Sequence, residues 1–167
     1  MICLIPMMVP SQIYILPQYL TASALHLNNT ILGLAMPGLA STFGIFLLRQ
    51  FFMTIPNDLE EAAVLDGCNP GQIFFRIMLP LVKPGLVSLA IFTALFAYKD
   101  LLWPLIVNTS TNKMPLSSGL ALMQGQYTTN YPELMAGAMI AILPILIIFL
   151  FFQKQFVEGI ATTGIKG

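Results

Sequence analysis

Residues 57–80 read NDLEEAAVLDGCNPGQIFFRIMLP, and this stretch decides how the rest of the chain is interpreted. It holds four of the seven acidic residues of the chain, which are Asp58, Glu60, Glu61 and Asp66. Asn57 is a suitable N-cap and Glu60 stands three residues later, which is the capping-box pattern. Gly67 then has the position of a glycine just beyond a helix end. The stretch therefore predicts a first short helix that begins at Asn57 and ends before Gly67.

A second short helix is predicted to follow at once. Asn69 is expected at its N-cap and Pro70 at its first position, where the missing N–H is tolerated. Its apolar residues are Ile73, Phe74, Phe75, Ile77 and Met78. Pro80 is expected to stop it. The segment 54–83 thus predicts a helical hairpin outside the bilayer, and two interpretations remain open: it rests on the membrane surface, or it protrudes and docks on a cytosolic partner.

The composition points to a membrane protein. Of 167 residues, 57% are hydrophobic and 8% are charged, the mean hydropathy is +0.83 and the formal net charge is zero. An ordinary soluble domain carries about 25% charged residues, so a soluble enzyme is nearly excluded. A disordered chain needs the opposite composition, and balanced charge without basic clusters gives no nucleic-acid footprint. An all-α, polytopic bundle in the lipid bilayer remains, because helices satisfy their own backbone groups there.

Four membrane spans are predicted, since about 20 apolar residues cross a bilayer. They cover residues 1–20, 31–53, 84–107 and 134–152 of a single membrane domain, 1–167. Prolines break the first span, but they are tolerated where neighbouring helices satisfy the freed backbone groups. The third span is interrupted by Lys99-Asp100.

The basic residues predict the orientation of these spans, because short cytoplasmic loops are enriched in Lys and Arg. One side carries Arg49, Arg76, Lys83, Lys154 and Lys166. The other side carries Lys113, with Lys99 inside a span near it. The loop 54–83 and the C-terminus are therefore expected in the cytoplasm, and the loops 21–30 and 108–132 outside.

The spacing within the hairpin matches a known signature at every position. It reads Glu61-Ala62-Ala63, three residues, Gly67, nine residues, Ile77, one residue, Leu79-Pro80. This pattern resembles the signature loop of binding-protein-dependent ABC importer permeases. The stretches that resemble the carbohydrate-uptake branch are 43–52, 60–67, 79–84, 100–105 and the tail 164–167. Over essentially its whole length, the chain resembles the second permease of maltose-type and glycerol-phosphate-type importers.

The resemblance implies a bundle of the type I ABC importer permease kind and a transport subunit without catalysis of its own. It implies a path for a sugar or related polyol and no cofactor, because the ATP would be bound by a partner ATPase. The implied partners are a second permease in a heterodimer, two cytosolic ATPase subunits and an extracytoplasmic solute-binding protein. The implied location is a bacterial-type cell (inner) membrane.

In these importers the signature loop fits a cleft on the ATPase. The coupling residues that the resemblance implies are Glu61, Ala62, Ala63, Asp66, Gly67, Phe74, Ile77, Leu79 and Pro80. The small Ala62 and Ala63 would let another backbone approach, and Glu61 could pair with a basic residue. Gly67 permits a turn that a Cβ would obstruct. The aromatic and aliphatic side chains would form an apolar patch that needs a partner.

Lys99 and Asp100 are the second candidate site. Ionisable residues within a span usually face a cavity or a partner, so the pair could line the solute path, with Trp103 offering a face for sugar stacking. The alternative is that Lys99 snorkels to the headgroups at the outer membrane surface. The sequence leaves both interpretations open.

Two other classes of function compete with that of a transport subunit. A membrane-embedded enzyme needs a nucleophile–base set or a metal triad, and one histidine with the distant Cys3 and Cys68 supplies neither. A structural or assembly subunit, or an inactive truncated permease, is the alternative. The family usually has six spans, so the resemblance implies the C-terminal portion of a permease that should not transport alone. The loop 114–132 is expected to reach toward the binding protein.

Overall fold

The computed structural model describes residues 5–125 and 129–164, with the backbone alone described from residue 154 onward. Within these residues the regular structure is helical, apart from one isolated bridge between Gln124 and Thr129. The predicted all-α fold is therefore confirmed. Cys3 and the last three residues of the tail lie outside the described residues.

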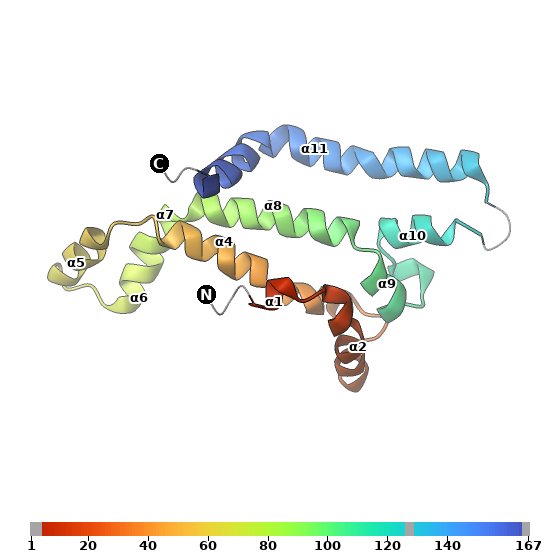
Figure 1. Ribbon diagram of the computed structural model, residues 1–167, viewed down its shortest axis with the longest axis horizontal. Coiled ribbons are helices and arrows are strands. Elements are labelled where there is room, and N and C mark those ends of the chain that lie inside the picture. Colours follow the sequence, from red (N-terminus) through yellow and green to blue (C-terminus); the bar gives the residue numbers. More distant parts are fainter. Residues whose placement is uncertain (1–4, 126–128, 165–167) are drawn as a thin grey trace.

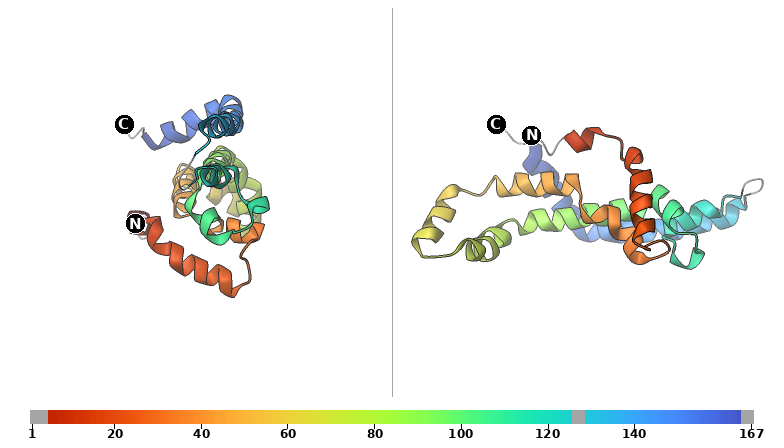
Figure 2. Two further views of the ribbon diagram at one scale, coloured as in Figure 1. Left: turned by 90° about the vertical axis from the view of Figure 1, so that its right-hand side faces the viewer. Right: turned by 90° about the horizontal axis from the view of Figure 1, so that it is seen from below.

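Three long helices run side by side: α4 (Thr42–Phe52), α8 (Lys83–Lys99) and α11 (Tyr131–Gly164). The helix α8 lies between the other two and contacts both (Figure 1, Figure 2). Gly85 lets α4 approach, because a Cβ there would lie 2.6 Å from the ring of Phe51. On the other side, the Tyr98 hydroxyl donates a hydrogen bond of 2.7 Å to the carbonyl of Ala141 in α11.

Up to three membrane spans are present by length and composition. The segment Tyr131–Gln153 of α11 qualifies alone, with a mean hydropathy of 2.8. Two bent pairs qualify if each is one broken span: Ile31–Leu39 with Thr42–Phe52, bent by 47°, and Pro70–Leu81 with Lys83–Lys99, bent by 69°. The spans predicted over 31–53 and 134–152 thus coincide with suitable helices.

The prediction of one spanning helix over residues 1–20 is wrong for its described part. Residues 5–24 form three short pieces: α1 (Ile5–Met8), the 3₁₀ turn η2 (Ser11–Tyr14) and α2 (Ile15–Ala24). Pro10 is extended, with φ −56° and ψ 128°, and stands between the first two. Proline has no N–H for a helical hydrogen bond and restricts the residue before it, so the chain turns there.

The segment 84–107 forms two helices, because α8 ends at Lys99 and α9 (Leu102–Val107) follows the extended Asp100. The prediction of one span over 84–107 is therefore wrong, because the helix ends at the charged pair that was expected to lie within it. With 17 residues, α8 is about 26 Å long. The helix α11 continues well past the predicted end at residue 152. The loop 108–132 contains η5 (Thr111–Lys113) and α10 (Leu116–Leu122).

The two ends of the bundle differ in kind. The chain between α4 and α8 projects as a hairpin at one end, and α9 and α10 gather at the other, near α3 (Ile31–Ala35) and η3 (Met36–Leu39) (Figure 1). The helix α11 starts at the second end and returns toward the hairpin (Figure 1). The hairpin and the C-terminal end of α11 thus lie toward one end, and α9 and α10 lie at the other.

Candidate functional site

The projecting hairpin is built from α5 (Asn57–Leu65), α6 (Pro70–Gln72), the π-helical turn η4 (Ile73–Met78) and α7 (Leu79–Leu81). Gly67 ends its first helix with φ +79°. The Gly67 N–H donates to the carbonyl of Val64, and the Cys68 N–H donates to the carbonyl of Ala63, both at 3.0 Å. These two bonds are the Schellman pattern. The predicted role of Gly67 is confirmed.

The N-terminal caps are distributed differently from the prediction. Asn57 is the first residue of α5, with Pro56 at the N-cap and no side-chain cap, so the capping box predicted for Asn57 and Glu60 is wrong. The capping box is formed instead by Asn69 and Gln72, whose two reciprocal hydrogen bonds are 2.9 Å long. The same spacing signal is present in the sequence at Asn69, where only the N-cap was predicted.

Pro80 does not stop the second helix, which corrects another prediction. Helical structure continues through η4 to Leu81, and the chain bends by 69° at Val82 before α8 begins. A π turn interrupts the regular hydrogen-bond ladder. Pro80 therefore does not remove a hydrogen bond from a continuous α-helix.

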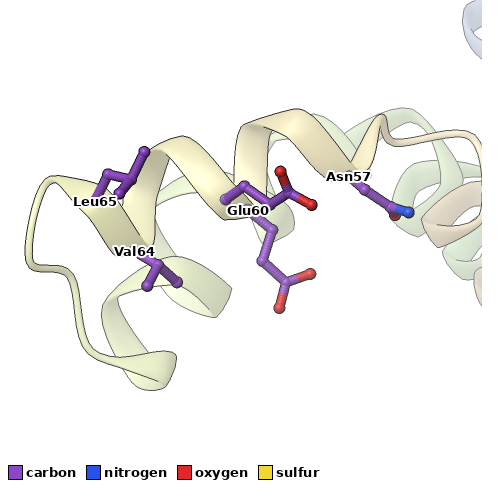
Figure 3. Close-up of a pocket in the computed structure, with 5 residues that line it drawn as sticks. Asn57, Glu60, Val64 and Leu65 are labelled. Carbon is purple, nitrogen blue, oxygen red and sulfur yellow. The ribbon is translucent and has the colours of Figure 1, made fainter.

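One face of α5 is hollowed and open. The residues that line it are Asn57, Glu60, Glu61, Val64 and Leu65, and Figure 3 shows the labelled ones projecting from this one helix. Their spacing is that of a single helix face. Leu65 is 88% exposed and Val64 is 57% exposed. Two carboxylates thus stand beside two solvated aliphatic side chains.

The inner side of the hairpin holds its two helices together. Ala63 and Ile73 are its buried residues between α5 and η4. The ring of Phe74 stacks on Phe52 at the end of α4, with ring centres 6.1 Å apart and planes 15° apart. The small size of Ala63 therefore serves packing within the hairpin, whereas Ala62 is exposed.

All the predicted coupling residues lie in this hairpin. The exposed ones are Glu61, Ala62, Asp66, Gly67, Phe74 and Pro80, and the half-buried ones are Ile77 and Leu79. Only Ala63 is fully buried. A second hollow between the helices is lined by Glu60, Val64, Cys68, Pro70, Ile73, Phe74 and Met78. The hairpin can offer carboxylates and apolar side chains to a partner. In the described part of the chain, no three His, Cys, Asp or Glu residues could hold a metal ion.

The candidate path residues lie at the other end of α8. Lys99 is exposed and Asp100 is half-buried. Trp103 is 4% exposed. Its indole Nε1–H donates a buried hydrogen bond of 2.9 Å to the carbonyl of Gly33. The indole is a core side chain here, so its placement gives no support to a role in sugar stacking.

A hydrogen-bonded junction around Asn29 and Asn108, at the same end of the bundle, was missed from the sequence. The sequence alone places both residues in loops outside the membrane. The positive φ of Asn29 (58°) is compatible with its residue type, because asparagine tolerates the left-handed region. The residue type of Asn29 alone does not reveal which segment its side chain bonds to.

Residues 1–161 match the family described as "Binding-protein-dependent transport system inner membrane component". The chain belongs to this family. It is 42% identical over 164 residues to the arabinooligosaccharides transport system permease protein AraQ of Bacillus subtilis (strain 168), covering 98% of this chain and 58% of that protein. It is 36% identical over 158 residues to the sn-glycerol-3-phosphate transport system permease protein UgpE of Salmonella typhi, covering 93% and 56%.

A solved structure agrees with the family. It is that of a bacterial ABC transporter involved in the import of the acidic polysaccharide alginate. It matches with a TM-score of 0.72 and 27% identity, over 84% of this chain and 55% of the other. The resemblance inferred from the signature loop is therefore confirmed. The chain spans little more than half the length of these relatives.

Proposed function

We propose that this chain is part of a transmembrane subunit of an ATP-driven importer, in which the hairpin couples the solute path to an ATPase. The observation that carries the proposal is the α5 face, where Glu60 and Glu61 stand beside the exposed Val64 and Leu65. A cleft with basic residues at its rim and an apolar floor would complement this face. Such a partner would also cover aliphatic side chains that are otherwise left in water.

The connections of the hairpin support a mechanical role. The Phe52–Phe74 stack joins it to the end of α4, and the short bend at Val82 joins it to α8. Val82 is 1% exposed, so this bend is packed. A displacement of α5 by the ATPase would therefore be passed to both helices, which contact each other along the bundle.

The names of the relatives support the class of solute. AraQ is named for arabinooligosaccharides and UgpE for sn-glycerol-3-phosphate, so we propose a sugar or a related polyol. The proposed partners are a second permease, two ATPase subunits that bind ATP, and an extracytoplasmic solute-binding protein. Lys99, which is exposed, and Asp100 are proposed to line the path.

The proposed location is the bacterial-type inner membrane, with the hairpin and the C-terminus in the cytoplasm. The return of α11 toward the hairpin end supports a common side for both (Figure 1). Cys68 in the hairpin, half-buried and free, reports this orientation. An impermeant thiol reagent should label it from the cytoplasmic side only, and labelling from outside would invert the proposed topology.

The function is tested by uptake of radiolabelled arabinotriose into vesicles that hold the full-length permease and its cognate partners. Glu61→Lys reverses a charge on the docking face, and Gly67→Asp places a carboxylate at the turn. Both should abolish ATP-dependent uptake while membrane insertion persists. Asp58→Lys is the control, because Asp58 is also an exposed acid of α5 but does not line the hollow. Near-normal uptake by the Glu61 and Gly67 variants, with the ATPase still bound, would overturn the coupling role.

A further inference from the structure

A compact unit lies at the end of the bundle opposite the hairpin, and we call it the outer clamp. It consists of residues 19–36, in α2, α3 and the start of η3, and residues 103–113, in α9 and η5. Its core is Ala22, Trp103 and Val107, which are 0%, 4% and 1% exposed. Tyr19, Leu27, Leu34 and Met36 pack against this core. Two stretches far apart in the sequence thus share one core.

Asn29 connects the two stretches through hydrogen bonds. Its N–H donates to the carbonyl of Val107 at 3.1 Å. Its Oδ1 accepts from the Thr109 N–H at 2.7 Å, from the Ser110 N–H at 3.0 Å and from the Thr109 hydroxyl at 3.2 Å. The side chain acts only as an acceptor in these bonds. One residue therefore holds the start of the loop that follows α9.

Two further side chains add hydrogen bonds within the clamp. Lys113 Nζ donates to the carbonyl of Asn29 at 2.8 Å. Asn108, which is 0% exposed, donates through Nδ2 to the carbonyl of Lys113 at 2.9 Å. Trp103 adds its indole bond to Gly33. The Trp103 bond is buried, so breaking it leaves an unpaired polar group behind, whereas the bonds of Asn29 and Lys113 fix the position of two distant segments.

The chain leaves the clamp through two breaks in helical structure. Ala40, with φ −127° and ψ 95°, follows η3 and precedes α4, where the axes bend by 47°. Asp100 (φ −64°, ψ 130°) and Leu101 (φ −117°, ψ −47°) separate α8 from α9. Such two-residue breaks can absorb a change of backbone angle without disturbing the helices on either side.

We propose that the outer clamp moves as one rigid unit, and that α4 and α8 swivel against it at Ala40 and at Asp100-Leu101 when the hairpin moves. This inference rests on the proposed coupling function. Asn29 is its positioning residue, because its side chain and backbone join the two stretches of the clamp.

The test measures distances between spin labels in the full-length permease, assembled with its partners and free of other reactive cysteines. One pair, Leu25→Cys with Asn112→Cys, lies within the clamp. The other, Thr93→Cys with Asn112→Cys, spans the break at Asp100-Leu101. All three positions are exposed. Upon ATP binding, the second distance should shift while the first keeps its centre and width. A shift of the first distance, or no shift of either, would overturn the proposal.

Variants of Asn29 test its part separately and without ATP. Asn29→Gly permits the positive φ but removes the three accepted hydrogen bonds, so the Leu25–Asn112 distribution should broaden. Asn29→Asp keeps the acceptor and should restore the narrow distribution. If the Leu25–Asn112 distance distribution stays narrow in the glycine variant, Asn29 does not hold the two stretches of the clamp together. Uptake by the unlabelled parent in the same vesicles keeps the two proposals distinguishable: loss of ATP-dependent uptake there counts against the importer function.

Discussion

The hairpin and the outer clamp stand at opposite ends of the same three helices, and they are held together in opposite ways. In the hairpin, the hydrogen bonds that cap the helices join residues three to five positions apart, and Leu65 is 88% exposed. In the clamp, the bonds from Trp103 to Gly33 and from the 109–113 segment to Asn29 join residues 70 to 84 positions apart, and the core is at most 4% exposed. The hairpin is thus stabilised locally and leaves the apolar side chains of one α5 face in water, whereas the clamp joins distant segments around the buried Ala22, Trp103 and Val107.

This difference separates two kinds of mutational effect. A change in the clamp removes buried contacts and should lower the free energy of unfolding of the chain itself. A change on the outer face of the hairpin removes contacts that only a partner can make. It should affect coupling and leave the folded chain almost unchanged.

The largest expected effect is that of Gly33→Ala in the clamp. A Cβ at Gly33 would collide with the backbone carbonyl of Leu27, so the clamp must open or shift. Substitutions that overpack a buried site in this way can cost about 3 kcal/mol. Thermal unfolding in detergent measures the cost. Gly38→Ala is the control, because its Cβ meets nothing within 4 Å. Equal melting temperatures for both variants would contradict the close packing of the clamp.

The next effect is that of Trp103→Phe. The smaller phenyl ring keeps only part of the apolar contacts and loses the Nε1–H, so the carbonyl of Gly33 is left without this donor and a small cavity remains. An unsatisfied buried acceptor costs about 1–3 kcal/mol. The same unfolding experiment should show that loss. Unchanged stability together with a changed KM for uptake would instead support a role of Trp103 in the solute path.

The hairpin could be predicted from the sequence because its signals are local. Gly67 and Asn69 act on residues within one turn, and their roles follow from their own conformational preferences. The error at Asn57 is also local, because α5 begins one position earlier than the capping box requires, with Pro56 at the N-cap and no side-chain cap. The error at Pro80 arose because a π turn, which has no comparable sequence signal, precedes it.

The outer clamp could not be predicted, because it depends on which distant segments meet. Nothing in the polar stretch around Asn29 indicates that its partners are Thr109, Ser110 and Lys113. Trp103 was assigned to the path because an aromatic residue near charges in a span suits a sugar. The same indole suits a small core equally well, and only the fold distinguishes these two uses.

A smaller effect, confined to the hairpin, is expected for Asn69→Ala. It removes the side-chain acceptor that caps α6, and loss of such a cap costs about 1 kcal/mol. Hydrogen exchange of the amides in residues 71–78 should become faster, while exchange in α8 stays unchanged. Asn57→Ala is the matched control, because no side chain caps α5. Faster exchange at α5 in that variant would restore the capping role first predicted for Asn57.

The smallest effect on stability is expected for Leu65→Ser. The side chain is almost fully exposed, so the unfolding free energy should change by less than about 0.5 kcal/mol. ATP-dependent uptake should nevertheless fall, because a partner that covers this position loses an apolar contact. The unfolding free energy and the ATP-dependent uptake are measured on the same preparation. Full uptake by this variant would show that the exposed leucine does not contribute to docking.

Photo-crosslinking in intact membranes tests the central claim most directly, that the hairpin meets the ATPase and the clamp does not. A photoreactive amino acid is placed at Leu65 in one variant and at Leu25, 59% exposed in the outer clamp, in another. Both are co-expressed with the cognate importer subunits. Leu65 should crosslink to the ATPase subunit, and Leu25 should not. A crosslink to the ATPase from Leu25, or none from Leu65 in a preparation that transports, would contradict the account.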